Sequence, residues 1–147
     1  GAYPVSAVLA NDAIMNVIKP GQHGSTFGGN PVAAAVAMAA LEVVSEENLA
    51  QNARKLGKIF RSELEKYIQT SSIATLVRGK GLLNAIVIND SEDSDTAWNI
   101  CLKLAENGLL AKPTHGNIIR FAPPLVMNET QLQECISIIT GTLKEFE

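Results

Sequence analysis

The chain has 147 residues and a net charge of −3, and 46% of its residues are hydrophobic while 18% are charged. This composition is typical of one globular domain and excludes a disordered tail, and without a basic excess there is no reason to expect nucleic acid or an acidic membrane as a partner. No apolar run reaches the length of about 18 residues that a membrane-spanning helix needs.

The first residues predict a short strand followed by a brief helix. Residues 4–10 first alternate between apolar and other residues and then are all apolar, a pattern that favours a strand. Asn11 and Asp12 supply a cap for a helix over residues 13–18, and Lys19-Pro20-Gly21 ends that helix.

A glycine-rich loop follows from Gly21 to Pro31. It holds four glycines and two adjacent hydroxyls, Ser25 and Thr26, and it ends on Asn30-Pro31, an N-cap followed by a proline at the first helical position. Glycines let backbone N–H groups approach a ligand, and hydroxyls beside a helix start suit the oxygens of a phosphate. The loop lacks a nucleotide P-loop ending, so a phosphate site and a plain structural turn both stay open.

Two helices are predicted next. Residues 32–44 are rich in alanine and apolar nearly all the way round, which predicts a helix buried on most of its surface. Ser45 is expected to cap a new helix, with Glu46 and Glu47 in its first turn. That helix is amphipathic and is predicted to end near Ile68.

The pattern then changes to that of strands. Residues 73–77 and 82–89 are rich in β-branched residues and predict two strands, or one strand broken at a bulge, around Arg78-Gly79-Lys80-Gly81. The two cations of that interruption either contact an anion or lie in a solvated turn. Residues 90–95 form a polar connection that lacks the ligand spacing of a calcium loop.

The last part predicts a helix, two short strands and a final helix. Residues 96–107 are expected to form a helix that buries Trp98, Cys101, Leu102 and Ala105 and is ended by Gly108. Strands at 109–112 and 118–121 flank a turn at 114–117, and Asn128 with Gln131 caps the last helix. The order of elements indicates an α+β fold with helices packed on a small, largely antiparallel sheet.

The cysteines and histidines carry little functional signal. Cys101 and Cys135 lie in apolar helical patterns without the spacing of a metal site or a redox motif, so we expect buried thiols in a reducing, intracellular compartment and no metal. His23 and His115 lie in loops, where a structural or solvent role is the more frequent one.

Arg120 is the most informative single charge. It lies in the middle of the apolar run Ile118 to Phe121, where a half-buried guanidinium needs a carboxylate or phosphate partner. A carboxylate would be held by two parallel hydrogen bonds. An internal salt bridge or a side chain reaching solvent at the sheet edge explains the pattern equally well.

Six stretches, in order, resemble the ornithine aminotransferase family of class III, fold-type I, pyridoxal-phosphate aminotransferases. They cover the chain nearly end to end and are Tyr3-Pro4-Val5-Ser6-Ala7-Val8-Leu9, Ile18-Lys19-Pro20-Gly21, His23 to Pro31, Arg78 to Ala85, Leu109 to Gly116, and Ile119-Arg120-Phe121-Ala122-Pro123-Pro124-Leu125. The glycine loop alone indicates the class, and the stretch through Arg120 indicates the ornithine enzymes within it.

The resemblance implies a role for three residues. Thr26, with Ser25 beside it, would bind the phosphate of pyridoxal 5'-phosphate, with Thr26 reaching into the neighbouring subunit's site of a homodimer. Arg120 would hold the α-carboxylate of the substrate. The implied reaction moves the δ-amino group of ornithine to 2-oxoglutarate and yields glutamate 5-semialdehyde and glutamate. Related class III enzymes acting on acetylornithine or 4-aminobutyrate, and a non-catalytic α+β binding module, are the alternatives.

The resemblance also places the family's Schiff-base lysine just before Gly1. We therefore expect no catalytic residue in this chain and no activity from it alone. Residues 1–44 would be the C-terminal remnant of the large cofactor domain with its connecting helix, and residues 45–147 the small domain. Any targeting segment would lie upstream, so the choice between mitochondrial matrix and cytoplasm stays open.

Overall fold

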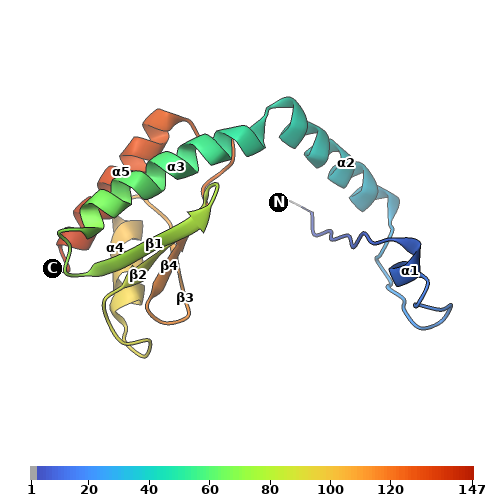
Figure 1. Cartoon of the computed structure of the whole chain (residues 1–147), viewed down its shortest axis with the longest axis horizontal. Coiled ribbons are helices and arrows are strands. Elements are labelled where there is room, and N and C mark those ends of the chain that lie inside the picture. Colours follow the sequence, from blue (N-terminus) through green and yellow to red (C-terminus); the bar gives the residue numbers. More distant parts are fainter. Residues whose placement is uncertain (1–2) are drawn as a thin grey trace. The chain divides into compact units, whose positions relative to one another are not determined.

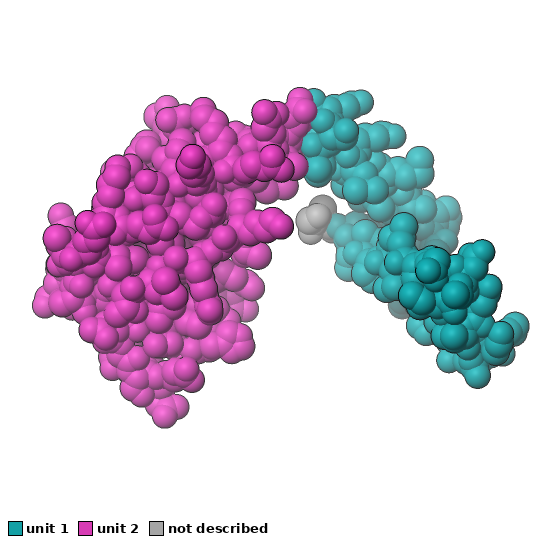
Figure 2. Space-filling model, viewed as in Figure 1, with its two compact units in different colours: residues 1–47 teal, residues 48–147 magenta. Residues whose placement is uncertain are grey.

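The computed structural model describes residues 3–147. The described residues fall into two compact units, the first ending at Glu47 and the second running from Asn48 to Glu147. Figure 2 colours the two units separately. Within the described residues, no helix is both long enough and apolar enough to cross a membrane.

The first unit holds helices α1 (Asp12–Met15) and α2 (Pro31–Glu46), joined by the glycine loop. Asn11 caps α1 and Asn30 caps α2, each by accepting a hydrogen bond from a backbone N–H three residues on, as predicted. The predicted strand at residues 4–10 is wrong, because in the described chain no other strand pairs with this segment. The predicted burial of α2 is not met either, since Ala33 is its one buried residue within the described chain.

The second unit packs three helices on a four-stranded antiparallel sheet (Figure 1). The helices are α3 (Leu49–Ile68), α4 (Thr96–Glu106) and α5 (Glu129–Lys144). The strands are β1 (Ala74–Lys80), β2 (Leu83–Ile88), β3 (Lys112–Thr114) and β4 (Ile118–Phe121), in the spatial order β1-β2-β4-β3. This is the α+β architecture that the sequence predicts.

One face of the sheet carries the core. Val77, Ile86 and Ile119 are opposite one another on β1, β2 and β4, and all three are buried. Phe121 on the same face packs against Phe60 of α3 with ring centroids 5.8 Å apart. Side chains alternate between the two faces along a strand. The residues next to these core positions on each strand therefore project to the other face of the sheet, which we call the open face.

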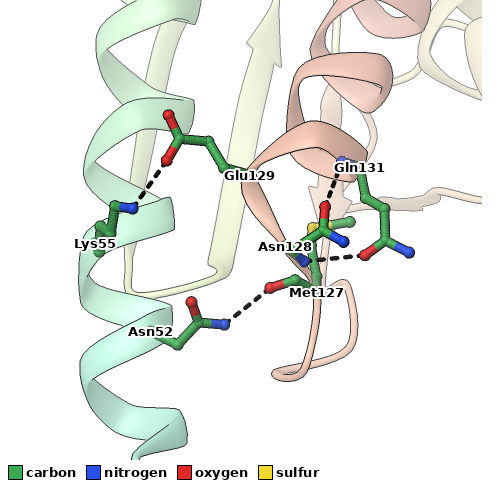
Figure 3. Close-up of polar contacts among 6 residues, drawn as sticks. All are labelled: Asn52, Lys55, Met127, Asn128, Glu129 and Gln131. Atoms are coloured by element: carbon green, nitrogen blue, oxygen red, sulfur yellow. Dashed lines mark hydrogen bonds and ion pairs between the residues drawn. The ribbon is translucent and has the colours of Figure 1, made fainter.

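Polar contacts join the start of α5 to α3 (Figure 3). Asn128 and Gln131 form the predicted capping box, each side chain accepting from the other residue's backbone N–H. Asn52 of α3 donates to the carbonyl oxygens of Leu125 and Met127, at 2.8 and 2.9 Å. These bonds hold the segment after β4 against α3.

Arg61 and Asn84 fix the tight turn between β1 and β2. The Arg61 guanidinium donates to the side-chain oxygen of Asn84 at 2.7 Å and to the carbonyl of Gly81 at 3.1 Å. Asn84 is buried and donates to the same carbonyl. Buried polar groups are stable only when hydrogen-bonded, and this network satisfies them while closing the hairpin.

Three sequence predictions fail in instructive ways. Ser45 lies inside α2, and α3 instead begins after Asn48, whose φ of 52° is a left-handed conformation that asparagine tolerates. Trp98 and Leu102 are about half exposed, at 54% and 48%, because α4 turns its Ala97, Ile100 and Leu104 side to the core instead. The two predicted strands are present as β1 and β2, but residues 78–80 of the predicted interruption 78–81 belong to β1.

Candidate functional site

The glycine loop holds its shape through short-range hydrogen bonds. The Ser25 hydroxyl accepts from the Gly28 N–H at 2.9 Å, and the Asn30 side chain donates to the Phe27 carbonyl at 2.8 Å. A Cβ at Gly28 would lie 2.9 Å from the Ser25 Cβ, and Gly29 has a φ of +71°, so both glycines suit positions that other residues occupy poorly. The loop is therefore defined by its own sequence.

The hydroxyls of Ser25 and Thr26 differ in their hydrogen bonding. The Ser25 hydroxyl accepts a hydrogen bond from Gly28, whereas Thr26 is exposed and its hydroxyl has no hydrogen-bond partner among residues 3–147. A threonine hydroxyl that donates no internal hydrogen bond is able to donate to a phosphate oxygen. The donor set thus fits a phosphate at Thr26, and Ser25 serves mainly to shape the loop.

Arg120 lies on the open face of the sheet, in the second unit. Its neighbours Ile119 and Phe121 are buried on the core face, so the guanidinium of Arg120 projects away from the helices and is exposed. The expectation of a half-buried arginine is therefore wrong. Of the alternatives that the sequence leaves open, the internal salt bridge is absent, because Arg120 has no ion pair within the described part of the chain.

Arg120 belongs to a row of residues that crosses all four strands. Arg78 on β1 is opposite Ala85 on β2, Ala85 is opposite Arg120 on β4, and Arg120 is opposite Lys112 on β3. Residues directly opposite one another project to the same face of a sheet. We call Arg78, Ala85, Arg120 and Lys112 the cationic row.

Charge is segregated on this face. The four strands contain no acidic residue, and their four cations are Arg78, Lys80, Lys112 and Arg120. Like charges directly opposite one another, as in Lys112 and Arg120, destabilise a sheet. An anion bound between them relieves that repulsion, which makes the open face chemically suited to carboxylates.

Sequence reasoning named Arg120 and missed its neighbours in the row. The sequence leaves Arg78 open between an anion contact and a solvated turn, because this residue lies in the interruption between two predicted strands. The signal that finds it is alternation, because Leu76 and Arg78 lie on either side of the buried Val77. Lys112 was given no role at all.

A cavity of the second unit lies elsewhere. A cavity of about 300 Å³ is lined largely by apolar side chains, including Phe121, Met127 and Cys135, and none of its lining residues is charged. A site for an amino acid needs charged partners, so the open face fits that ligand better than this cavity does.

The remaining candidates are the two cysteines and the two histidines. Burial raises the pKa of the Cys101 thiol to about 11, and burial together with Glu134 raises that of Cys135. Both thiols are therefore protonated at neutral pH. His23 and His115 are exposed, and residues 3–147 contain no cluster of side chains that would hold a metal ion.

Known proteins resemble the chain along its whole length. The model of the family described as aminotransferase class-III matches residues 1–143. Ornithine aminotransferase, mitochondrial, of Drosophila melanogaster is 63% identical over 143 residues, which are 97% of this chain and 32% of that protein. The protein of the same name from Rattus norvegicus is 60% identical over 146 residues, which are 99% of this chain and 33% of that protein.

Solved structures agree in fold. A structure described as acetylornithine aminotransferase from Elizabethkingia anophelis is 70% identical with a TM-score of 0.93, covering 99% of this chain and 36% of that one. A structure of Plasmodium falciparum ornithine δ-aminotransferase is 49% identical with a TM-score of 0.92, covering 99% of this chain and 37% of that one.

The chain thus spans about a third of the length of the curated relatives it matches, and it corresponds to their C-terminal part. The family model covers nearly every residue of the chain. The chain belongs to the class-III aminotransferase family.

Proposed function

We propose that the chain is the C-terminal part of a pyridoxal-phosphate-dependent ornithine δ-aminotransferase. The whole protein would transfer the δ-amino group of ornithine to 2-oxoglutarate. The observation that carries this proposal is the name shared by curated relatives that are 48–63% identical over essentially the whole chain. The cationic row gives independent chemical support, because both substrates carry a carboxylate.

Arg120 is the residue of this chain that would orient the substrate. Its planar guanidinium forms two parallel hydrogen bonds with a carboxylate and so fixes direction as well as charge. The backbone of β4 is held on both sides, by β2 and by β3, so the arginine projects from a rigid element. Orientation of this kind brings the reacting amine or carbonyl into position without further ordering cost.

Thr26 is the residue that would hold the cofactor's phosphate, by donating its free hydroxyl. Pyridoxal phosphate, when bound, supplies the electron sink that the transfer of an amino group requires. The proposal includes a homodimer in which Thr26 serves the neighbouring subunit's site. The apolar residues exposed on α2, among them Val36, Met38 and Leu41, support an interface with other parts of the whole protein.

The proposal extends to the division of the chain. Residues 1–44 would complete the large cofactor domain, and residues 45–147 would form the small domain. The separate compactness of residues 1–47 and 48–147 supports a boundary in this region.

A second candidate is an acetylornithine aminotransferase, because the 70% identical structure carries that name. Both enzymes would use Arg120 and Thr26 alike, so these residues do not separate them. The two donors share a carbon skeleton and the reacting δ-amine. They differ at the α-amine, which is charged in ornithine and acetylated in N-acetylornithine.

Donor profiling of the full-length protein tests the proposal. Glutamate formation from 2-oxoglutarate is measured with ornithine, N-acetylornithine and 4-aminobutyrate as donors. We expect the highest kcat/KM with ornithine. A higher kcat/KM with N-acetylornithine would assign the protein to the second candidate, and no turnover with any of the three would refute both.

A further inference from the structure

The side chain of Asn30 joins three parts of the first unit. Its oxygen accepts from the Ala33 N–H at 2.8 Å, which caps α2, and its nitrogen donates to the Phe27 carbonyl at 2.8 Å, which closes the glycine loop. The same oxygen accepts from the Tyr3 hydroxyl at 3.5 Å. One amide group therefore connects a helix, a loop and the first described segment of the chain.

This arrangement holds the backbone on both sides of Thr26. On one side the Ser25 hydroxyl accepts from the Gly28 N–H, and on the other the Phe27 carbonyl accepts from Asn30. The Thr26 hydroxyl has no hydrogen-bond partner among the described residues. A free donor on a fixed backbone is pre-organised for a ligand, because its direction is set before the ligand arrives.

Tyr3 adds a contact of a different range. The other side-chain bonds of the glycine loop join residues three apart, whereas the bond from Tyr3 to Asn30 spans 27 residues. Bonds between near neighbours shape a loop but leave it able to move as a whole. A bond to a distant segment resists that motion, and Tyr3 is only 39% exposed, so more than half of its surface is covered.

The segment that contains Tyr3 has its own place in the proposed site. The family resemblance puts the Schiff-base lysine just before Gly1, so Tyr3 follows that lysine closely in sequence. Pyridoxal phosphate carries its aldehyde and its phosphate on different carbons of one ring. The bond from Tyr3 to Asn30 thus joins the segment expected to meet the aldehyde to the loop proposed to hold a phosphate.

We propose that Tyr3 is a positioning residue for the cofactor phosphate, acting through Asn30 to fix the direction of the Thr26 hydroxyl. This inference rests on the proposed function. Because Tyr3 acts on the phosphate donor and not on the ring, its effect is confined to the phosphate-dependent part of the binding free energy. A ligand with the same ring and aldehyde but no phosphate should be insensitive to Tyr3.

The test uses the full-length protein, freed of cofactor, in a buffer without phosphate. It is titrated with pyridoxal 5'-phosphate or with pyridoxal, and the absorbance of the bound ligand is followed. Tyr3→Phe removes only the hydroxyl and is expected to raise the Kd for pyridoxal 5'-phosphate by about 3- to 10-fold, the range of one neutral hydrogen bond. The Kd for pyridoxal should stay within about twofold.

The chain offers a matched control. Tyr67→Phe removes the same hydroxyl from the second unit, where Tyr67 donates to Glu147, and should change neither Kd. It also reports how far a general loss of stability affects cofactor binding. A rise in the Kd for pyridoxal 5'-phosphate in Tyr67→Phe equal to that in Tyr3→Phe would overturn the proposal.

A second variant tests whether Tyr3 acts through Asn30. Asn30→Ser keeps a residue type that caps helices but removes the amide that donates to the Phe27 carbonyl. It should weaken pyridoxal 5'-phosphate selectively, and adding Tyr3→Phe to it should raise that Kd by less than about twofold further, because coupled residues are not additive. Fully additive losses would overturn the proposed coupling.

The remaining outcomes separate this inference from the proposed function. If wild type binds pyridoxal 5'-phosphate but Tyr3→Phe weakens both ligands equally, or neither, only the role of Tyr3 is refuted. If wild type does not bind pyridoxal 5'-phosphate, the proposed cofactor and function fail first. Binding is measured without turnover, so the identity of the amino donor does not enter. If Tyr3→Phe does not fold, the two-ligand comparison with Asn30→Ser decides.

Discussion

Tyr67 ties the end of α3 to the last residue of the chain. Its hydroxyl donates to the Glu147 carboxylate at 2.7 Å. Burial, more than this bond, raises the pKa of Tyr67 to about 12. The hydrogen bond from Tyr67 is the largest cause of a lowered pKa at Glu147. Both shifts make folding stability depend on pH.

The sign of the alkaline effect follows from the raised pKa. An unfolded tyrosine loses its proton near pH 10 and the folded Tyr67 near 12, so the stabilisation is complete below pH 10 and is lost as the pH rises from 10 to 12. Tyr67→Phe should lack this part of the decline. Urea unfolding of wild type and variant between pH 8 and pH 11 measures it, and parallel stability curves would contradict the assignment.

At the acid end the hydrogen bond to Glu147 acts in the opposite direction. A lowered folded pKa gives stability that is present above the unfolded value and lost as the pH falls through the folded one. The stability difference between wild type and Tyr67→Phe should therefore narrow when Glu147 becomes protonated. A difference that stays constant across the acid range would show that the bond does not favour the ionised carboxylate.

Individual residues show which features of the site can be predicted from the sequence. Arg120 is identifiable because a charge inside the apolar run Ile118 to Phe121 is unusual, and Asn128 with Gln131 predicts the capping box seen in α5. The exposure of Arg120 is not predictable from one strand, because it depends on which face the helices cover. Arg78 needs the pairing of β1 with β2 before its alignment with Arg120 is visible.

Among the elements, α3 and the β1–β2 turn meet at two glycines. A Cβ on Gly57 would lie 1.8 Å from the carbonyl oxygen of Gly81 and 2.4 Å from its carbonyl carbon. Both atoms are backbone and cannot turn aside as a side chain would. A glycine in the middle of a helix costs about 1 kcal/mol relative to alanine, and the close approach of the turn explains why α3 keeps one.

Gly57→Ala is therefore expected to destabilise the protein, although alanine is the better helix former. Forcing a methyl group into this contact should cost about 1 to 3 kcal/mol of unfolding free energy. Gly141→Ala in α5 is the matched control, because no atom lies within 4 Å of its added Cβ. That variant should gain about 0.5 to 1 kcal/mol. Urea unfolding compares them, and a stabilised Gly57→Ala protein would show that the turn yields easily.

Predictions about helices and strands are correct where neighbouring residues in the sequence determine the structure. They are wrong where tertiary packing determines it. The caps at Asn11, Asn30 and Asn128 are local and are confirmed. The buried side of α4 is wrong because Trp98 and Leu102 fit a helical apolar stripe as well as Ile100 and Leu104 do. Only contact with the sheet and α5 selects between the two sides.

The first unit of the molecule exposes a large apolar surface. Met38, Leu41 and Phe27 are 62%, 70% and 82% exposed. Patches of this kind mark contacts with other protein surfaces. We expect the 147-residue chain alone to bind a hydrophobic dye and to form aggregates, and the full-length protein to bind no dye and to form nothing larger than the proposed homodimer. A monomeric chain without dye binding would contradict this expectation.

Arg120 is the residue on which the proposed carboxylate binding depends most directly. Steady-state kinetics of the full-length protein with ornithine and 2-oxoglutarate compare wild type, Arg120→Gln and the control Arg54→Gln. The loss of charge-assisted hydrogen bonds worth about 1.5 to 3 kcal/mol should lower kcat/KM for both substrates by roughly 10- to 150-fold in Arg120→Gln alone. Unchanged turnover of both substrates by Arg120→Gln would contradict the role of the open sheet face in carboxylate binding.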